Sequence, residues 1–179
     1  MTSLETTEAK AALDALASVL PPAGAIYVCG PLDHGRLYYE AKARSEDGAQ
    51  VRSANQAALT AFAERLRSVQ SKPVVDPGIL RVEGWNGRSY GEFFLEVIRR
   101  FVCEAWFIDG WVYSHGATKE FLLCQELGIP TRDADGELLS VEVARSTISD
   151  AADHLVRLGV DDGKLRERLA SLALVSSSR

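Results

Sequence analysis

The stretch Trp106–Gly128 reads W-F-I-D-G-W-V-Y-S-H-G-A-T-K-E-F-L-L-C-Q-E-L-G, and it decides the fold. Its apolar beginning predicts a strand that ends at Asp109, and its second half predicts a helix that opens at Ala117 and stops at the final glycine. This order puts Glu120 in the first turn of a helix that follows the carboxyl end of a strand. Ligands of open α/β sheets bind at that edge, so Glu120 is a candidate functional carboxylate.

Outside this stretch, strands and helices alternate along the chain. The pattern predicts strands at Ala25–Cys29, Pro73–Val75 and Ala105–Ile108, and helices at Leu4–Leu20, Val51–Val69, Tyr90–Val102 and Ala117–Leu127. Such alternation favours parallel βαβ units with right-handed crossovers. We therefore expect an α/β fold, a doubly wound (flavodoxin- or Rossmann-like) parallel sheet of four to five strands with helices on both faces. The polar segment Pro31–Gln50 is predicted to be a long irregular loop.

The chain divides into segments of different character. We expect an N-terminal helix within residues 1–22, the α/β core within 23–132, a C-terminal turn and helical appendage within 133–175, and a disordered tail at 176–179. Within the appendage, the sequence predicts an edge strand over Leu138–Val143 and helices over about Glu142–Leu158 and Lys164–Leu174.

The amino-acid composition limits the kinds of partner that the protein is expected to bind. The chain has 179 residues, of which 46% are hydrophobic, and a net charge of −5, which suits one domain with a full core. An acidic balance argues against a nucleic-acid polymer as the partner. No run approaches the ~20 apolar residues of a membrane span, so we expect no membrane partner. Cys29, Cys103 and Cys124 are odd in number and lie in apolar contexts, which favours free thiols and a cytoplasmic location.

Three strand ends meet at one edge of the predicted sheet and bring polar residues together. The first delivers Tyr27 and Gly30, the second Asp76, and the third Asp109 and the Ser114–Glu120 segment. The preceding helix adds Glu92 and Glu96, which lie one turn apart on one face. Several carboxylates beside a phenol suit chemistry at a glycosidic carbon. There one acid attacks or stabilises an oxocarbenium-like transition state and another manages the proton of the leaving group.

Three motifs carry a resemblance to a known family. I-Y-V-C-G-P (Ile26–Pro31), V-V-D-P (Val74–Pro77) and S-H-G-A-T-K-E (Ser114–Glu120) resemble the nucleoside 2-deoxyribosyltransferase superfamily, which includes 2'-deoxynucleoside 5'-phosphate N-hydrolases. The resemblance spans about Ile26 to Pro130.

The resemblance implies a role for each matching residue. Glu120 would be the nucleophile that forms a glycosyl-enzyme ester, Glu96 would exchange a proton with the base, and Tyr27 would hydrogen-bond Glu120 or the sugar. The substrate would contact Gly30, Asp76, Asp109, Ser114 and Gly116, and Ser114 and Arg36 match positions that bind a 5'-phosphate in the hydrolase branch. It implies no metal or redox cofactor, a small nucleoside or nucleotide as partner, and a homo-oligomer, dimeric or larger.

Departures from the family pattern keep other interpretations open. Glu96 and Glu104 stand where the family has aspartate, and Pro31 replaces a hydroxyl residue that binds phosphate in the hydrolase branch. Hydrolase and transferase activities share the first half-reaction, so both remain open. The alternatives are a non-catalytic nucleotide-binding or sensing module and a glycohydrolase of dinucleotides such as NAD. The two proposed catalytic acids also have simpler, structural explanations. Glu120 could stabilise the start of its helix by its charge, and Glu96 could form ion pairs with Arg99 and Arg100.

Overall fold

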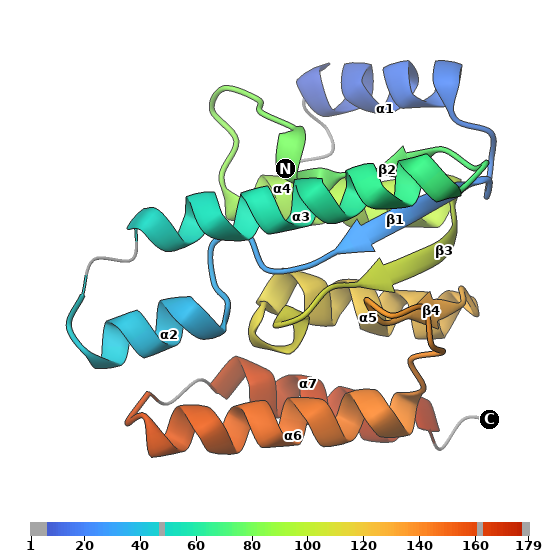
Figure 1. Cartoon of the computed structure of the whole chain (residues 1–179). Helices are drawn as coiled ribbons and strands as arrows, with labels where there is room; N and C mark the ends of the chain where they lie inside the picture. The colour runs from blue at the N-terminus through green and yellow to red at the C-terminus, as the bar shows by residue number, and fades with distance from the viewer. Residues whose placement is uncertain (1–6, 47–48, 161–162, 177–179) are drawn as a thin grey trace.

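A parallel sheet forms the centre of the protein. The computed structural model describes residues 7–46, 49–160 and 163–176. Within them, β1 (Ala25–Cys29), β2 (Val74–Val75), β3 (Val102–Phe107) and β4 (Thr131–Arg132) pair in parallel in the order β2-β1-β3-β4. Helices cover both faces of this sheet (Figure 1), so the predicted doubly wound α/β fold is confirmed.

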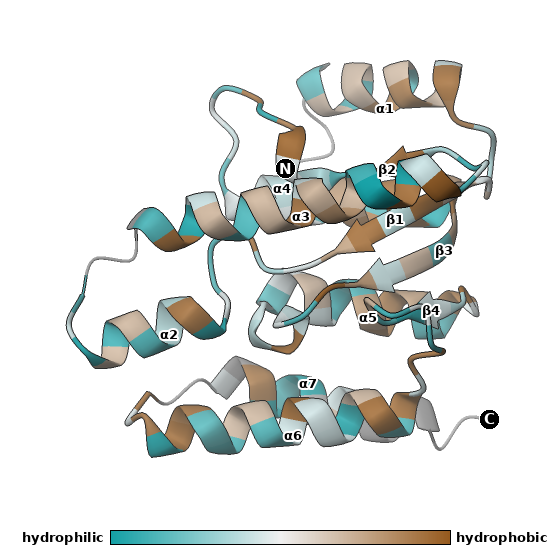
Figure 2. Ribbon diagram, in the orientation of Figure 1, coloured by the Kyte–Doolittle hydropathy of each residue, from teal (hydrophilic) through white to brown (hydrophobic). Residues whose placement is uncertain are grey.

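Strand β1 is buried on both of its faces, as its uninterrupted apolar sequence predicts. Ile26 and Val28 face α3 (Ala49–Val69), whose Leu59 and Phe62 share their apolar cluster. Tyr27 and Cys29 face the opposite way, into a larger cluster with α4 (Gly87–Phe101) and α5 (His115–Leu127). The period-2 alternation of the strand therefore sends Tyr27 and Cys29 to the same face. Figure 2 shows the hydrophobic colouring of β1 between these layers.

The terminal helices extend the same core. Helix α1 (Thr7–Val19) packs on α4, and α6 (Val141–Arg157) pairs with α7 (Gly163–Ser176), which in turn packs on α5. Leu13, Ile148 and Leu165 belong to the cluster that contains Tyr27.

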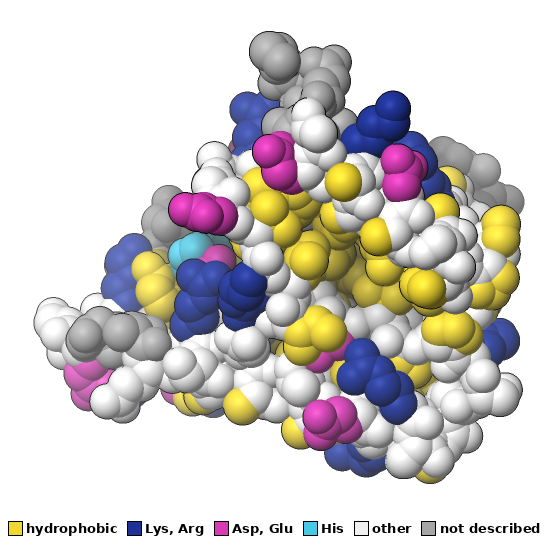
Figure 3. All heavy atoms as spheres, turned by 90° about the horizontal axis from the view of Figure 1, so that it is seen from above, with side chains coloured by type: hydrophobic (Ala, Val, Ile, Leu, Met, Phe, Trp, Pro, Cys, Tyr) yellow, Lys and Arg dark blue, Asp and Glu magenta, His cyan; other side chains and the backbone are white. Residues whose placement is uncertain are grey.

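The surface is hollowed on one side. Viewed from above (Figure 3), hydrophobic side chains gather around this hollow and charged ones lie at its margins. No helix within the described ranges is long and apolar enough to cross a membrane.

The region predicted as an irregular loop contains a helix. Helix α2 (Arg36–Ala43) lies within Pro31–Gln50, and α3 begins at Ala49, so that prediction is wrong. The helix buries Tyr39 and Ala41 and carries an Arg36–Glu40 ion pair of 2.7 Å at i,i+4 spacing. Its short apolar face was too small to stand out among polar neighbours.

The C-terminal elements differ from expectation in detail. The predicted edge strand at Leu138–Val143 is reduced to one antiparallel bridge between Arg132 and Leu138. Helix α6 begins at Val141 because the Ser140 hydroxyl caps it, accepting from Val143 N at 3.2 Å. The two-residue strand β4 and two short 3₁₀ helices, η2 (Pro77–Ile79) and η3 (Trp111–Tyr113), were not predicted. Residues 177–179 of the expected disordered tail lie outside the described residues, and α7 includes Ser176.

Candidate functional site

A cavity lies at the point where the strand order of the sheet reverses. From β1 the chain passes first to β2 on one side and then to β3 on the other, and ligands of doubly wound sheets bind at such a switch point. The cavity has a volume of about 620 Å³. It is lined by residues that follow β1 and β2, by α4, and by the first turns of α5: among them Gly30, Leu32, His34, Pro77, Leu80, Tyr90, Glu92, Phe94, Ser114, Gly116, Lys119 and Glu120.

Glu120 on the cavity wall is held by Tyr27. The phenol donates a hydrogen bond of 3.0 Å to Glu120 Oε1. Burial raises the pKa of Glu120 to about 7, and the hydrogen bond from Tyr27 opposes that rise. Burial, with the nearby Glu120 charge, also raises the pKa of Tyr27 well above its usual value. Tyr27 therefore stays protonated and remains a donor, while Glu120 exchanges between its two charge states near neutral pH.

Glu120 does not lie where the sequence predicted within its helix. Helix α5 begins at His115 rather than at Ala117, because the Ser114 hydroxyl caps it, accepting from Ala117 N at 3.3 Å. The first turn of α5 contains no acidic residue, and Glu120 lies in the second turn. The favourable field of the helix end falls off within one turn. Burial therefore influences the pKa of Glu120 more than the helix dipole does, and the interpretation of Glu120 as a helix-start charge is wrong.

Four of the predicted site residues lie together on this cavity: Gly30, Ser114, Gly116 and Glu120. A Cβ atom on Gly30 would lie 2.5 Å from Ile108 Cγ1, so β1 and β3 leave no room for a side chain there. Gly116 is different, since the nearest atom to an added Cβ is Ser114 Oγ at 3.8 Å. The open space beside Gly116 lets a ligand approach the start of α5 closely.

The structure does not bring Glu96 to the cavity. Its carboxylate accepts from Arg100 Nε at 2.6 Å and lies 3.5 Å from Arg99 Nη1, as its simpler interpretation predicted. Glu92, one turn earlier, does line the cavity and pairs with Arg88 at 2.9 Å. The direction of α4 could have predicted which of the two acids reaches the cavity. A helix that follows a parallel strand starts at the carboxyl edge, so the earlier of two acids lies nearer the ligand.

Two predicted aspartates hold turns beside the site rather than lining it. Asp76 is buried and accepts from Gly78 N at 2.7 Å and from the Thr60 hydroxyl at 2.8 Å, which fixes the turn that presents Pro77 to the cavity. Asp109 is exposed and precedes Gly110, whose φ of 80° forms the turn into η3. Neither is among the described residues that line the cavity.

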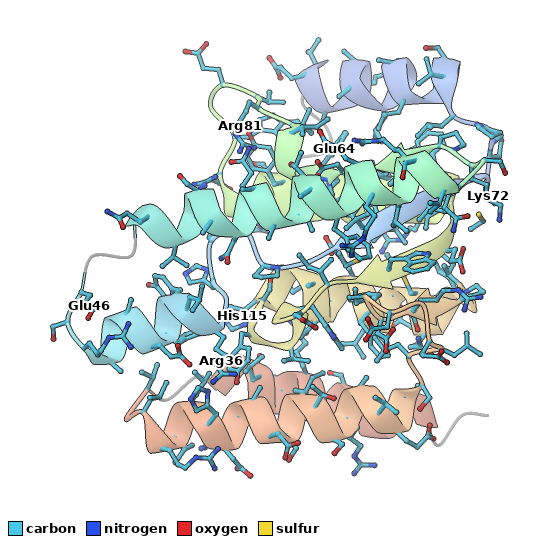
Figure 4. The ribbon with its side chains drawn as sticks, in the orientation of Figure 1. Arg36, Glu46, Glu64, Lys72, Arg81 and His115 are labelled. Atoms are coloured by element: carbon cyan, nitrogen blue, oxygen red, sulfur yellow. The ribbon has the colours of Figure 1, made fainter. Side chains whose placement is uncertain are left out.

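Arg36, the predicted phosphate ligand, also lies away from the cavity. Its side chain is 63% exposed and pairs with Glu40, and Figure 4 shows it between α2 and α6. Other cationic side chains line the cavity instead, namely Arg52, Arg81, Arg88 and Lys119. Arg52 pairs with Asp33 at 3.1 Å, and Arg81, on the loop after η2 (Figure 4), donates to Gln56 at 2.5 Å.

Two histidines add further polar groups to the cavity. His34 and His115 both line the cavity, with ring centroids 6.2 Å apart. His115 Nε2 lies 3.5 Å from the Tyr39 hydroxyl, at the start of α5 (Figure 4). Among the described residues, no group of three or more His, Cys, Asp or Glu side chains has the arrangement of a metal site.

Comparisons with known proteins do not assign the chain. Neither a scan against protein-family models nor searches of curated proteins and of solved structures found a match.

Proposed function

We propose that this protein cleaves or transfers the N-glycosidic bond of a nucleoside or nucleotide, with Glu120 as the nucleophile. One observation carries the proposal. A carboxylate on the wall of a cavity, at the switch point of a parallel sheet, accepts a hydrogen bond from a fully buried tyrosine. Titratable groups with strongly shifted pKa values in such clefts are candidates for catalysis.

The proposed reaction has two steps. Glu120 attacks the anomeric carbon, the bond from that carbon to the base nitrogen breaks, and the base leaves with a proton supplied by an acid. A water molecule, or a second base in the transferase case, then attacks the same carbon and releases Glu120. Glu92, which lines the cavity, takes the proton-managing role that the family resemblance assigned to Glu96.

The raised pKa of Glu120 fits this role. At a pKa of about 7, the ionised and protonated forms are both populated near neutral pH. A carboxylate with little surrounding water is a stronger nucleophile than a hydrated one. The ionised form attacks, so activity is expected to rise with pH through this pKa.

Product analysis tests the proposal. The protein is incubated with a panel of nucleosides, deoxynucleosides, their 5'-phosphates and NAD, with and without an acceptor base, and free base is separated by chromatography. We expect base release from at least one member by the wild type and a loss of at least about 10³-fold in Glu120→Gln. Glu96→Gln is the matched control, because its carboxylate lies outside the cavity. No release by the wild type, or equal release by Glu120→Gln, would overturn the proposal.

A nucleotide-binding module without catalysis is the second candidate. Arg52, Arg81 and Lys119 at the cavity would hold a phosphorylated ligand without any reaction. In that case nucleotides would raise the melting temperature of the wild type and of Glu120→Gln alike, and no free base would be released.

We also propose a homo-oligomer, dimeric or larger. Val19, Val69 and Leu138 each expose about 70% of their surface, which is apolar area that a second copy would cover. Sedimentation velocity tests this, and a single monomeric species at micromolar concentration would contradict it.

A further inference from the structure

The loop between η2 and α4 brings a cationic side chain to the cavity. Arg81 on this loop is one of the residues that line the cavity. Its Nη2 donates to Gln56 Oε1 of α3 at 2.5 Å, and its Nη1 donates to the Leu80 carbonyl oxygen at 2.8 Å. Figure 4 shows Arg81 beside α3. Two contacts, one to a neighbouring helix and one to the backbone of its own loop, therefore fix the orientation of the guanidinium.

Two other cations of the cavity differ from Arg81 in their partners. Arg52 forms an ion pair with Asp33, and Arg88 forms one with Glu92. Both acceptors of Arg81 are neutral, and no acid in the part of the chain that the structure describes forms an ion pair with it. A guanidinium has more N–H donors than these two bonds occupy. The remaining donors of Arg81 can therefore serve a ligand.

The loop is attached to the helix that carries Glu92. The Tyr90 hydroxyl accepts a hydrogen bond from Val82 N at 2.9 Å and donates one to the Val82 carbonyl oxygen at 3.3 Å. Trp85 packs edge-on against the Tyr90 ring, with the ring centroids 5.1 Å apart. Val82 follows Arg81 directly in the chain, and Tyr90 lies near the start of α4. Arg81 is therefore held close to the start of α4.

This end of the cavity corresponds to the leaving group of the proposed reaction. Glu120 on α5 is the proposed nucleophile, and Glu92 on α4 is the proposed donor of the proton to the base. When the anomeric carbon of a substrate lies at Glu120 and its base lies at Glu92, the base extends toward the start of α4. There it meets Arg81, which makes the edge of the base the natural partner of the guanidinium.

The geometry of a guanidinium discriminates between bases. Its N–H groups form a rigid fork that matches two adjacent acceptors, and in nucleic-acid recognition this fork commonly pairs with O6 and N7 of guanine. Hypoxanthine presents the same two acceptors, and cytosine presents O2 and N3. Adenine instead presents an amino group beside N7. An amino group that faces the guanidinium leaves donors of both partners without acceptors, which weakens binding.

We infer that Arg81 is a specificity-determining residue that selects leaving bases with two adjacent hydrogen-bond acceptors, such as the 6-oxopurines and cytosine, over 6-aminopurines. Gln56 and the loop bound by Tyr90 position its guanidinium. The inference rests on the proposed function for the direction in which the base lies. The selection itself concerns binding and requires no bond cleavage.

Binding of free bases tests the inference without catalysis. Hypoxanthine and adenine form a matched pair, because they are purines that differ in the edge that carries the group at C6. By isothermal titration calorimetry we expect the wild type to bind hypoxanthine at least about 10-fold more tightly than adenine. In Arg81→Gln this preference should fall to about twofold or less, and Arg81→Lys should keep only part of it, because an ammonium group lacks the fork. Cytosine compared with uracil should follow the same pattern.

Two further variants test whether the position of the charge matters. Arg65→Gln removes an arginine of α3 that lies over the Phe62 ring and is not among the described residues that line the cavity, so the preference should stay within about twofold of the wild-type value. Gln56→Ala keeps the charge but removes its bond to α3, so the preference should decrease without disappearing. Arg81 is exposed, and an unchanged melting temperature of each variant verifies its fold.

Three results would overturn the inference. The first is equal affinity of the wild type for hypoxanthine and adenine, or no binding of either base. The second is an unchanged preference in Arg81→Gln. The third is binding of inorganic phosphate that Arg81→Gln abolishes while the preference among bases persists, which would make Arg81 a ligand of phosphate instead.

The failure of the inference can be told apart from that of the proposed function. A preference among bases that depends on Arg81, without any base release, would leave the selection intact and remove only the glycosidic chemistry. Base release with a preference that ignores Arg81 would do the reverse. When both hold, the ratio of kcat/KM for deoxyinosine over deoxyadenosine should fall in Arg81→Gln together with the ratio of affinities.

Discussion

The Tyr27 hydroxyl donates to Glu120 Oε1 over 3.0 Å, between residues 93 positions apart in the chain. The bond joins the central strand β1 to helix α5 at the end of the sheet where the cavity opens. A buried tyrosine of this kind normally needs a partner for its hydroxyl. Here the partner is the only acid whose pKa burial raises to about 7 among those in the described residues.

Loss of the phenol should make Glu120 harder to ionise. In Tyr27→Phe the pKa of Glu120 is expected to rise by about one unit above its value of about 7. Since the ionised form attacks, base release at pH 7 should fall several-fold and recover in part at pH 9. Tyr113→Phe is the matched control, because the Tyr113 hydroxyl lies 2.9 Å from His154 Nδ1 instead. An unchanged pH–rate profile in Tyr27→Phe would contradict the assignment.

Glu120 should destabilise the fold above neutral pH. Its pKa is about 7 in the folded protein and 4.5 ordinarily, so its favourable contribution is complete below pH 4.5 and lost as pH rises through about 7. Glu120→Gln cannot ionise and should gain up to about 3 kcal/mol over the wild type at pH 8, with most of that gain absent at pH 4.5. Urea unfolding of both proteins at the two pH values measures the difference. A pH-independent difference would show that Glu120 titrates normally.

Substitution of the two acids of α4 should have different effects on base release. Glu92→Gln is expected to lower base release by about 10²-fold, because it removes the proposed proton donor from the cavity wall. Glu96→Gln should change it less than twofold, since it breaks only exposed ion pairs with Arg99 and Arg100. Steady-state kinetics at several pH values distinguishes the two variants. The opposite order would restore Glu96 to the role that the sequence gave it.

Two glycines of the site should respond differently to the same substitution. Gly30→Ala puts a Cβ 2.5 Å from Ile108 Cγ1 and 2.9 Å from Leu59 Cδ1, so we expect a loss of about 1–3 kcal/mol in unfolding free energy. Gly116→Ala meets only Ser114 Oγ at 3.8 Å and should fold as well as the wild type. Its methyl group enters the space beside α5, so KM should rise. Thermal unfolding and kinetics of the pair check both expectations, and an unstable Gly116→Ala would show that the space is needed by the protein itself.

The sequence predicted the strand–helix order well, because β1 and α3 have long and regular apolar patterns. The prediction was less accurate where a single side chain determines where a helix begins or which way a residue points. The Ser114 cap moved the start of α5 by two residues, which placed Glu120 one turn deeper than expected. Arg36 was assigned by the family resemblance of its loop, but it lies on α2 and pairs with Glu40.

The tertiary contacts that set the chemistry of the site were beyond sequence reasoning. Glu104, which stands where the family has aspartate, is an example. Its carboxylate forms an ion pair with Arg132 that links β3 to β4. The hydrogen bond from Tyr27 to Glu120 is another, since it joins residues that lie 93 positions apart in the chain. Both depend on which elements lie side by side, and that information is spread over the whole chain.

The packing of α7 against α5 has a consequence for how the protein is made. Leu165 of α7 is fully buried in the same cluster as Tyr27, so α5 is covered by a helix that is synthesised after it. Domains tend to fold from the N-terminus during synthesis. Helix α5 is therefore synthesised before one of the helices that cover it. A nascent chain that stops near Arg132 would lack Leu165 and would leave part of the cluster around Tyr27 uncovered.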